Sequence, residues 1–244
     1  MDINLMNFIG NLLFRISMIA IGLVYISLSP IAAVSTKFAR KTTMIWLSSI
    51  IVCSRIFCGI KVEIHNNNFH HEKGIIVASN HCSAWETFFI SQYYNVPVFI
   101  LKKSLTQIPF IRIFIKKFNM IGIDRDSYSK KNIVNIIKNA NATLKLGRNI
   151  VIFPQGTRVP IEETYNYTQY PYKSGVAMFA SGKRIVTIST DASKCFGKGL
   201  FSKKKSGTVN VIFNEIITIE KEDSKEEIAN KIRNSIEVGL KKII

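Results

Sequence analysis

The chain has 244 residues, of which 47% are hydrophobic and 20% charged, so it can bury one substantial core and is too apolar to be disordered. Its formal net charge of +17 favours polyanionic partners such as anionic lipid, nucleic acid or phosphorylated substrates. Lysines on solvated faces would give the same charge, so this balance alone excludes few functions.

The first sixty residues carry much of the apolar character behind the mean hydropathy of +0.16. Residues 16–34 contain no charged side chain and are nearly long enough to span a bilayer. A basic turn at residues 37–41 follows, and a second apolar stretch at residues 44–60 is interrupted by Arg55. We therefore predict that residues 1–60 form a membrane-associated helical hairpin.

A cleaved signal peptide is the alternative for the first stretch, but Asp2 and the late first positive charge at Arg15 do not fit a basic leader. The positive-inside rule places the basic turn in the cytoplasm, and two full crossings would then put the rest of the chain outside. A hairpin lying partly in the cytoplasmic leaflet avoids this conflict. We expect a bacterial inner-membrane protein whose main domain lies on the cytoplasmic face.

Residues 61–244 show the alternation of a single α/β domain, in which short apolar runs suited to buried strands alternate with helical stretches. The expected strands are residues 74–79, 96–101, 149–153, 184–189 and 208–213, and the expected helices are residues 84–94, 108–118, 130–146 and 222–242. This pattern predicts an α/β fold with a mainly parallel central sheet flanked by helices.

His81 and Glu86 are the first candidate site residues, because they follow the first of these strands, where sites in such sheets gather. Residues five apart do not share one face of an ideal helix, but they meet if His81 lies in the turn and Glu86 in the first helical turn. A carboxylate bonded to one imidazole nitrogen fixes the tautomer and makes the other nitrogen a better base. A structural His–Glu pair is the alternative.

Cys82 is a competing nucleophile, but adjacent side chains diverge, so His81 is badly placed to activate it. The other histidines, His65, His70 and His71, lie in a polar loop without metal-ligand spacing, and we predict no metal site. The four cysteines form no CxxC pair, which favours reducing surroundings over a disulfide framework or a zinc ribbon.

Cationic side chains are predicted at three further strand ends. Residues 153–158 read Phe-Pro-Gln-Gly-Thr-Arg, in which Gly156 permits a tight turn and Arg158 can bind phosphate with two donors. Arg125 follows another short apolar run, and Lys102 ends a strand. Together they would form a pocket for a phosphate monoester, whereas each alone could be a surface cation.

Residues 102–117 contain five basic and no acidic residues among aliphatic and aromatic ones. This pattern fits an interfacial surface near lipid, or equally a core helix with a basic outer face.

These motifs, in this order, resemble the 1-acyl-glycerol-3-phosphate acyltransferase (lysophosphatidic acid acyltransferase) family over roughly residues 61–218. The similar blocks are residues 80–86, 122–125, 153–158 and 185–188, with further similarity at residues 102–105 and 172–175. The resemblance implies the glycerolipid acyltransferase fold, with His81 as general base and Glu86 as its orienting carboxylate. It also implies an acceptor site built from Lys102, Arg125, Gln155, Gly156, Thr157 and Arg158.

The activity implied by the resemblance is direct transfer of a fatty acyl group from acyl-CoA or acyl carrier protein to the free hydroxyl of 1-acyl-glycerol-3-phosphate. The product would be phosphatidic acid, a precursor in phospholipid biosynthesis, and no metal or other cofactor is required. The implied partners are a lysophospholipid acceptor, the acyl donor and an anionic membrane, without nucleic acid. A basic protein that only binds membranes or nucleic acid is the non-enzymatic alternative.

Three residues depart from the family pattern. Glu86 replaces the usual aspartate, but Trp85-Glu86-Thr87 is similar to some bacterial members, so we expect function to be retained. Gln155 replaces the usual glutamate, which leaves open an acyltransferase for a different lysophospholipid. Thr187 replaces the usual proline, which leaves the local shape of the acyl pocket open.

Overall fold

The computed structural model describes residues 3–66, 72–107, 109–123 and 130–244. Its N-terminal part is a hairpin of two long helices, α1 (Ile3–Ser27) and α3 (Thr36–Cys58), joined by the short helix α2 (Ser29–Val34). A proline lies in the first turn of α2, a position that needs no amide donor, so the apolar run at residues 16–34 is divided between α1 and α2. Ser35 caps α3 by accepting a hydrogen bond from the amide of Phe38.

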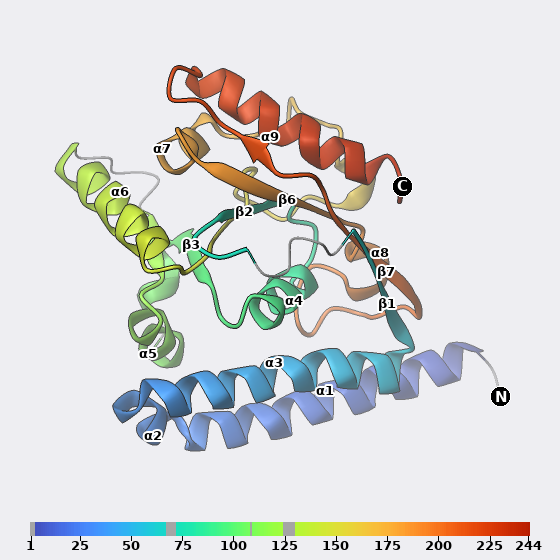
Figure 1. Ribbon diagram of the computed structural model, residues 1–244. Coiled ribbons are helices and arrows are strands. Elements are labelled where there is room, and N and C mark those ends of the chain that lie inside the picture. The colour runs from blue at the N-terminus through green and yellow to red at the C-terminus, as the bar shows by residue number, and fades with distance from the viewer. Residues whose placement is uncertain (1–2, 67–71, 108, 124–129) are drawn as a thin grey trace.

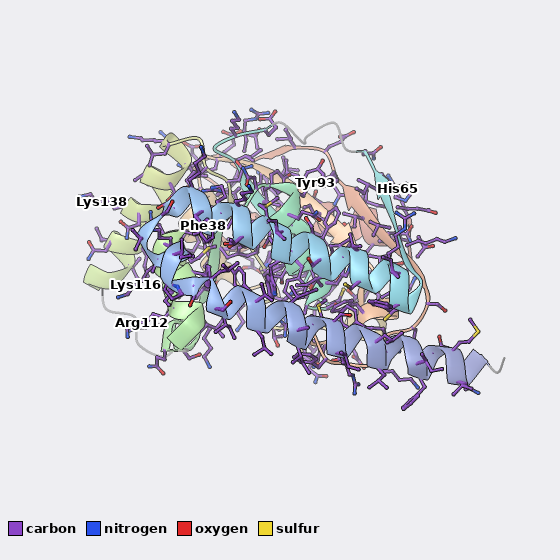
Figure 2. The ribbon with its side chains drawn as sticks, turned by 90° about the horizontal axis from the view of Figure 1, so that it is seen from below. Phe38, His65, Tyr93, Arg112, Lys116 and Lys138 are labelled. Atoms are coloured by element: carbon purple, nitrogen blue, oxygen red, sulfur yellow. The ribbon has the colours of Figure 1, made fainter. Side chains whose placement is uncertain are left out.

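The two long helices run antiparallel along one side of the molecule (Figures 1 and 2). Residues Asn4–Ser27 and Thr36–Cys58 are long and apolar enough to cross a membrane, with mean hydropathies of 1.9 and 1.3. Only 17% and 33% of their most apolar windows are buried against the rest of the protein. This outward apolar surface is consistent with membrane association.

The described residues form one mixed, mostly parallel sheet of eight strands in the order β1-β7-β6-β2-β5-β3-β4, with β8 paired to β6. The strands are β1 (Ile60–His65), β2 (Ile76–Ser79), β3 (Val98–Lys102), β4 (Ile121–Ile123), β5 (Ile150–Ile152), β6 (Arg184–Thr190), β7 (Gly207–Phe213) and β8 (Ile217–Thr218). Strand β6 pairs antiparallel with β7 and β8, and the other pairings are parallel. The predicted α/β fold with a mainly parallel sheet is confirmed.

Helices cover both faces of the sheet (Figure 1). They are α4 (Trp85–Tyr93), α5 (Pro109–Lys117), α6 (Lys130–Lys145), α7 (Ala177–Ala180), α8 (Ser193–Phe196) and α9 (Lys225–Leu240), with 3₁₀ turns at Lys103–Gln107, Ile161–Glu163 and Ser174–Val176. One apolar cluster joins the sheet to α4, α8 and the hairpin, and a second joins it to α6, α7 and α9. Burial of both sheet faces explains why central strands such as β5 and most of β2 are continuous apolar runs.

Strands β2, β3, β4 and β5 are mutually parallel, so their carboxyl ends lie at one edge of the sheet. The chain leaves β2 into residues 80–86 and leaves β5 into residues 153–158. Because β2 and β5 are hydrogen-bonded neighbours, these two segments lie side by side. This is the place where ligands bind in open α/β sheets.

Candidate active site

His81 and Glu86 meet in the turn between β2 and α4, as the sequence predicts. His81 Nδ1 lies 2.6 Å from Glu86 Oε1, which also accepts hydrogen bonds from the backbone amides of Cys82 (3.0 Å) and Ser83 (2.9 Å). Glu86 is 1% exposed and lies in the first turn of α4, where the helix dipole favours a negative charge. One carboxylate oxygen therefore receives all three of these hydrogen bonds.

The imidazole of His81 is held on its flat face as well. It stacks on Phe153, with ring centroids 4.0 Å apart and an interplanar angle of 18°. The His81 carbonyl accepts a hydrogen bond from the amide of Val159 at 2.7 Å. With Nδ1 engaged by Glu86, Nε2 is the nitrogen left to exchange a proton with a ligand. Sequence reasoning treated Phe153 only as the first residue of a motif and missed this stacking role.

Asn80 fixes the start of the same turn and was not singled out from the sequence. Its side-chain amide donates to the carbonyl of Thr190 (2.8 Å), and its oxygen accepts from the amide of Thr190 (2.9 Å). Asn80 is 2% exposed, so this pair of bonds joins the carboxyl end of β2 to that of β6 inside the protein. Asparagine is common after strands, and Thr190, the partner of Asn80, lies 110 residues away in the sequence. The sequence alone therefore did not indicate this role.

Cys82 is placed as a structural residue. It is 2% exposed, and its thiol contacts the carbonyl of Thr190 at 3.7 Å. Burial raises the pKa of the Cys82 thiol well above its ordinary value, so the thiolate needed for nucleophilic attack is disfavoured. Within the described part of the chain, no group of three or more His, Cys, Asp or Glu side chains is placed to hold a metal ion.

A cavity of about 640 Å³ lies beside His81, between the sheet and the hairpin. Its wall is mainly apolar and comes from α1, α3, α4, β3 and α5, and it includes Tyr25, Trp46, Phe88, Phe99, Phe114 and Phe118. Tyr25 stacks on both Trp46 (5.4 Å) and Phe114 (4.7 Å), which joins helices from the hairpin and the α/β domain. The volume lies in the range of ordinary ligand pockets, and the lining suits a long apolar chain.

Lys102, Gly156 and Arg158 line the same cavity as His81. Gly156 has a φ of 70°, a left-handed conformation that glycine adopts readily in the turn after β5. Arg158 Nε is buried without a hydrogen-bond partner among the described residues, which leaves this donor available to a ligand. Two predicted cations are thus brought to one apolar cavity beside the imidazole.

A smaller cavity of about 270 Å³ adjoins this region. It shares Ile100, Phe153 and Gly156 with the larger cavity and is also lined by Lys173 and by Ile123 at the end of β4. Phe153, on which the His81 ring stacks, borders both cavities, whereas His81 itself lines only the larger one among the described lining residues.

Two of the predicted acceptor residues, Gln155 and Thr157, do not line the cavities in the described structure. Gln155 is 2% exposed and donates to the carbonyl of Tyr170 at 3.4 Å. Thr157 is exposed, and neither residue belongs to the described lining of the two cavities. Arg125 lies outside the described residues.

Thr187 does not shape the large cavity. It is fully buried, and its hydroxyl pairs with Ser235 on α9 (2.6 Å) and accepts from the side-chain amide of Asn214 (3.0 Å). It is absent from the described lining of both cavities. The side chain faces α9, so this departure from the family pattern lies away from both described cavities.

The mainly parallel sheet and the His81–Glu86 turn define an α/β protein with a candidate acid–base pair at the end of a strand. A family model described as Acyltransferase matches residues 61–209, and the chain belongs to this family. Among curated relatives, the 1-acyl-sn-glycerol-3-phosphate acyltransferase of Pseudomonas aeruginosa is 29% identical over 178 residues, covering 72% of this chain and 67% of that protein. The enzyme of the same name from Helicobacter pylori is 31% identical over 169 residues, covering 69% and 66%.

The chain thus spans about two thirds of the length of these relatives. A solved structure, that of the 1-acyl-sn-glycerophosphate acyltransferase PlsC from Thermotoga maritima, matches with a TM-score of 0.68 and 20% sequence identity. The match covers 97% of both chains, so the hairpin and the α/β domain together have the PlsC-like fold.

Proposed function

We propose that this acyltransferase moves a fatty acyl group from acyl-CoA or acyl carrier protein to the free hydroxyl of 1-acyl-glycerol-3-phosphate, giving phosphatidic acid. The observation that carries the proposal is the His81–Glu86 pair beside an apolar cavity that also contains Lys102 and Arg158. An apolar cavity suits acyl chains, and cations suit a phosphate monoester. The names of the curated relatives support the same reaction.

In this mechanism, His81 Nε2 accepts the proton of the glycerol hydroxyl as its oxygen attacks the thioester carbonyl. The tetrahedral intermediate then collapses, the carbon–sulfur bond breaks, and the leaving thiolate takes the proton from the imidazolium. Glu86 stabilises the positive charge that the imidazole carries between these two steps. No covalent acyl-enzyme forms, and the thiol and the ester are the only products.

The acceptor phosphate is proposed to bind Arg158 and Lys102, with Arg125 joining from the segment after β4. Gly156 allows the backbone to approach the ligand closely, and Gln155 and Thr157 shape the acceptor site from behind the turn. The strongest support is the buried Nε of Arg158, which has no hydrogen-bond partner among residues 3–66, 72–107, 109–123 and 130–244, because a buried donor without an acceptor costs free energy until a ligand binds it.

The hairpin is proposed to lie in the cytoplasmic leaflet of a bacterial inner membrane, with residues 61–244 as the catalytic domain on the cytoplasmic face. Arg112 and Lys116 of α5 lie beside the turn end of the hairpin (Figure 2). The Lys117 ammonium donates to the carbonyls of Ala33 and Val34 in α2. Cations placed near an apolar surface suit anionic lipid headgroups.

Thiol release from acyl-CoA by the purified full-length protein, measured across a panel of lysolipid acceptors, tests the function. We expect release with lysophosphatidic acid and little with zwitterionic lysolipids. Because Gln155 lacks the usual carboxylate charge, a different lysophospholipid is the second candidate acceptor, and faster release with it would replace our assignment. Absence of release with every acceptor would overturn the enzymatic proposal in favour of a basic binding protein.

Arg158→Ala is expected to raise the KM for lysophosphatidic acid by about 10-fold or more, since a hydrogen bond to a charged group contributes roughly 1.5–3 kcal/mol. The KM for acyl-CoA should change less, because the lost group binds the acceptor. Arg184→Ala is the control, since this arginine is exposed and pairs with Glu72 at 3.3 Å away from the site. An unchanged KM for lysophosphatidic acid would count against the phosphate contact.

A further inference from the structure

Lys204 is a buried ammonium group that the proposed reaction does not use. It lies in the segment between α8 and β7, and it is 1% exposed. Its Nζ donates to the carbonyls of Leu200 (2.6 Å), Ser202 (2.6 Å) and Gly199 (3.3 Å), so all three ammonium protons have acceptors. This role could not be predicted from the sequence, because Lys204 is the middle residue of a run of three lysines.

Helix α1 completes the enclosure of Lys204. Asn11 accepts a hydrogen bond from the Lys204 amide (2.7 Å) and donates one to the Lys204 carbonyl (3.0 Å). One turn further on, the ring of Phe14 lies 5.0 Å from Nζ, and the ring of Phe196 in α8 lies 4.0 Å from it. Phe14 and Phe196 also contact each other edge to face at 5.9 Å. Lys204 thus joins the hairpin to the segment at residues 197–206.

The same segment reaches the His–Glu pair. The Gly197 carbonyl accepts a hydrogen bond from the Ser83 hydroxyl at 2.6 Å. Ser83 also donates its amide to Glu86 (2.9 Å), and its hydroxyl accepts from the amide of Trp85 (3.1 Å). A connection therefore runs from Asn11 in the hairpin to Lys204, along the backbone segment that Lys204 binds to Gly197, and from there to Ser83 and Glu86.

Burial disfavours the charged form of an ammonium group, and this desolvation cost lowers the pKa of Lys204 to about 8. Smaller effects come from nearby Cys58, which raises the pKa of Lys204, and from Arg15, which lowers it. An apolar side chain could fill the same space without that cost. It could not bind three carbonyls, which would then be left facing one another without a donor. The lysine is thus suited to fixing the shape of the segment at residues 197–206.

We propose that Lys204 is a positioning residue for acyl transfer, which holds residues 197–206 and α1 together and so keeps Ser83 and Glu86 in place behind His81. This inference rests on the proposed function, because a displaced Glu86 would slow the reaction only if His81 is the general base. It also gives the hairpin a part in the reaction beyond contact with lipid, since Asn11 and Phe14 belong to α1.

The test uses the full-length protein carrying Lys204→Met, with Lys203→Met and Lys205→Met as matched controls, because both neighbours are exposed. We expect the kcat of folded Lys204→Met to fall about 10-fold or more, with the KM values for acyl-CoA and acceptor nearly unchanged. Both controls should keep wild-type kcat. A Lys204→Met protein that unfolds at lower temperature but keeps wild-type kcat would reduce Lys204 to a structural role and overturn the proposal.

A double-mutant cycle tests whether Lys204 acts on the His–Glu pair through Ser83. Ser83→Ala removes the hydroxyl that binds Gly197 but leaves the Lys204 contacts intact. If Lys204 acts through Ser83, the combined variant should lose little more kcat than the more affected single variant. If instead the fold-loss in kcat of the combined variant equals the product of the two single fold-losses, the two residues act independently, and Lys204 does not act through Ser83.

A readout that needs no acyl transfer separates this inference from the proposed function. The chain has two tryptophans, so a Trp46→Phe background leaves Trp85 at the start of α4 as the single reporter. We expect acrylamide to quench Trp85 fluorescence severalfold more efficiently after Lys204→Met, and not after Lys205→Met. Unchanged quenching would refute the positioning role even if the wild-type protein transferred acyl groups, and increased quenching would support it even if the acceptor assignment failed.

Discussion

His81→Ala is expected to fold normally and to transfer acyl groups about 10²–10⁴ times more slowly than the wild type, the usual effect of removing a well-placed general base. The reason is the geometry of the ring, whose Nδ1 is bound to Glu86 at 2.6 Å and whose face rests on Phe153. Initial rates of thiol release at saturating acyl-CoA and lysophosphatidic acid measure the effect. Because removal of the imidazole leaves the acyl cavity and the cations in place, KM should change far less than kcat.

His65→Ala is the matched control, since His65 lies on the edge strand β1 and contacts only the side chain of Asn210, at 3.4 Å, among the hydrogen bonds of the described residues. Its kcat should equal that of the wild type. If His81→Ala turned over at a near-normal rate, the acceptor hydroxyl would have to be deprotonated elsewhere, and the proposed mechanism would be wrong.

The local part of the site could be predicted because its geometry depends on neighbours in the sequence. His81 and Glu86 are five residues apart, and a strand followed by a helix start brings them together whatever the rest of the fold does. The central buried strands could be predicted equally well, because burial on both faces leaves uninterrupted apolar runs such as residues 76–78 and 150–152. Strand β1 was missed because its exposed face carries polar residues at the edge of the sheet.

The supporting contacts could not be predicted because they join residues that are far apart in the chain. Ser83 and Gly197 are separated by 114 positions, and Asn11 and Lys204 by 193. A serine, an asparagine and a lysine have many uses, and only the packed structure shows which partner each one has. The large cavity is also a tertiary feature, since its wall combines the hairpin with α4, α5 and β3.

The direction in which each side chain of a recognised motif points could not be predicted from the sequence either. Residues 153–158 were correctly located at a strand end, but the turn at Gly156 sends neighbouring side chains to different places. Arg158 lines the large cavity, whereas Gln155 turns inward to the carbonyl of Tyr170. A motif therefore predicts where a site lies more reliably than it predicts which of its residues contact the ligand.

Glu86→Gln is expected to lower kcat about 10²–10⁴-fold while leaving the fold intact, because an amide in place of an orienting carboxylate cannot stabilise the imidazolium that forms during transfer. The structure makes this variant unusually informative. A single oxygen, Oε1, accepts from His81 and from the amides of Cys82 and Ser83, and the glutamine oxygen can accept the same three bonds. The second oxygen, Oε2, is buried without a partner among the described residues, so the new NH₂ group replaces an atom that makes no hydrogen bond there.

Glu86→Asp supplies the complementary control, since it keeps the charge and shortens the side chain by one methylene. If charge is what the reaction requires, the aspartate variant should retain more kcat than the glutamine variant, although the amides of Cys82 and Ser83 must shift to follow the carboxylate. Initial rates for both variants show whether the charge or the length of the side chain at position 86 matters more for kcat. Thermal unfolding checks that each variant is folded. A glutamine variant with wild-type kcat beside a slow aspartate variant would mean that position 86 acts through the shape of the turn, and the imidazolium would then need another source of stabilisation.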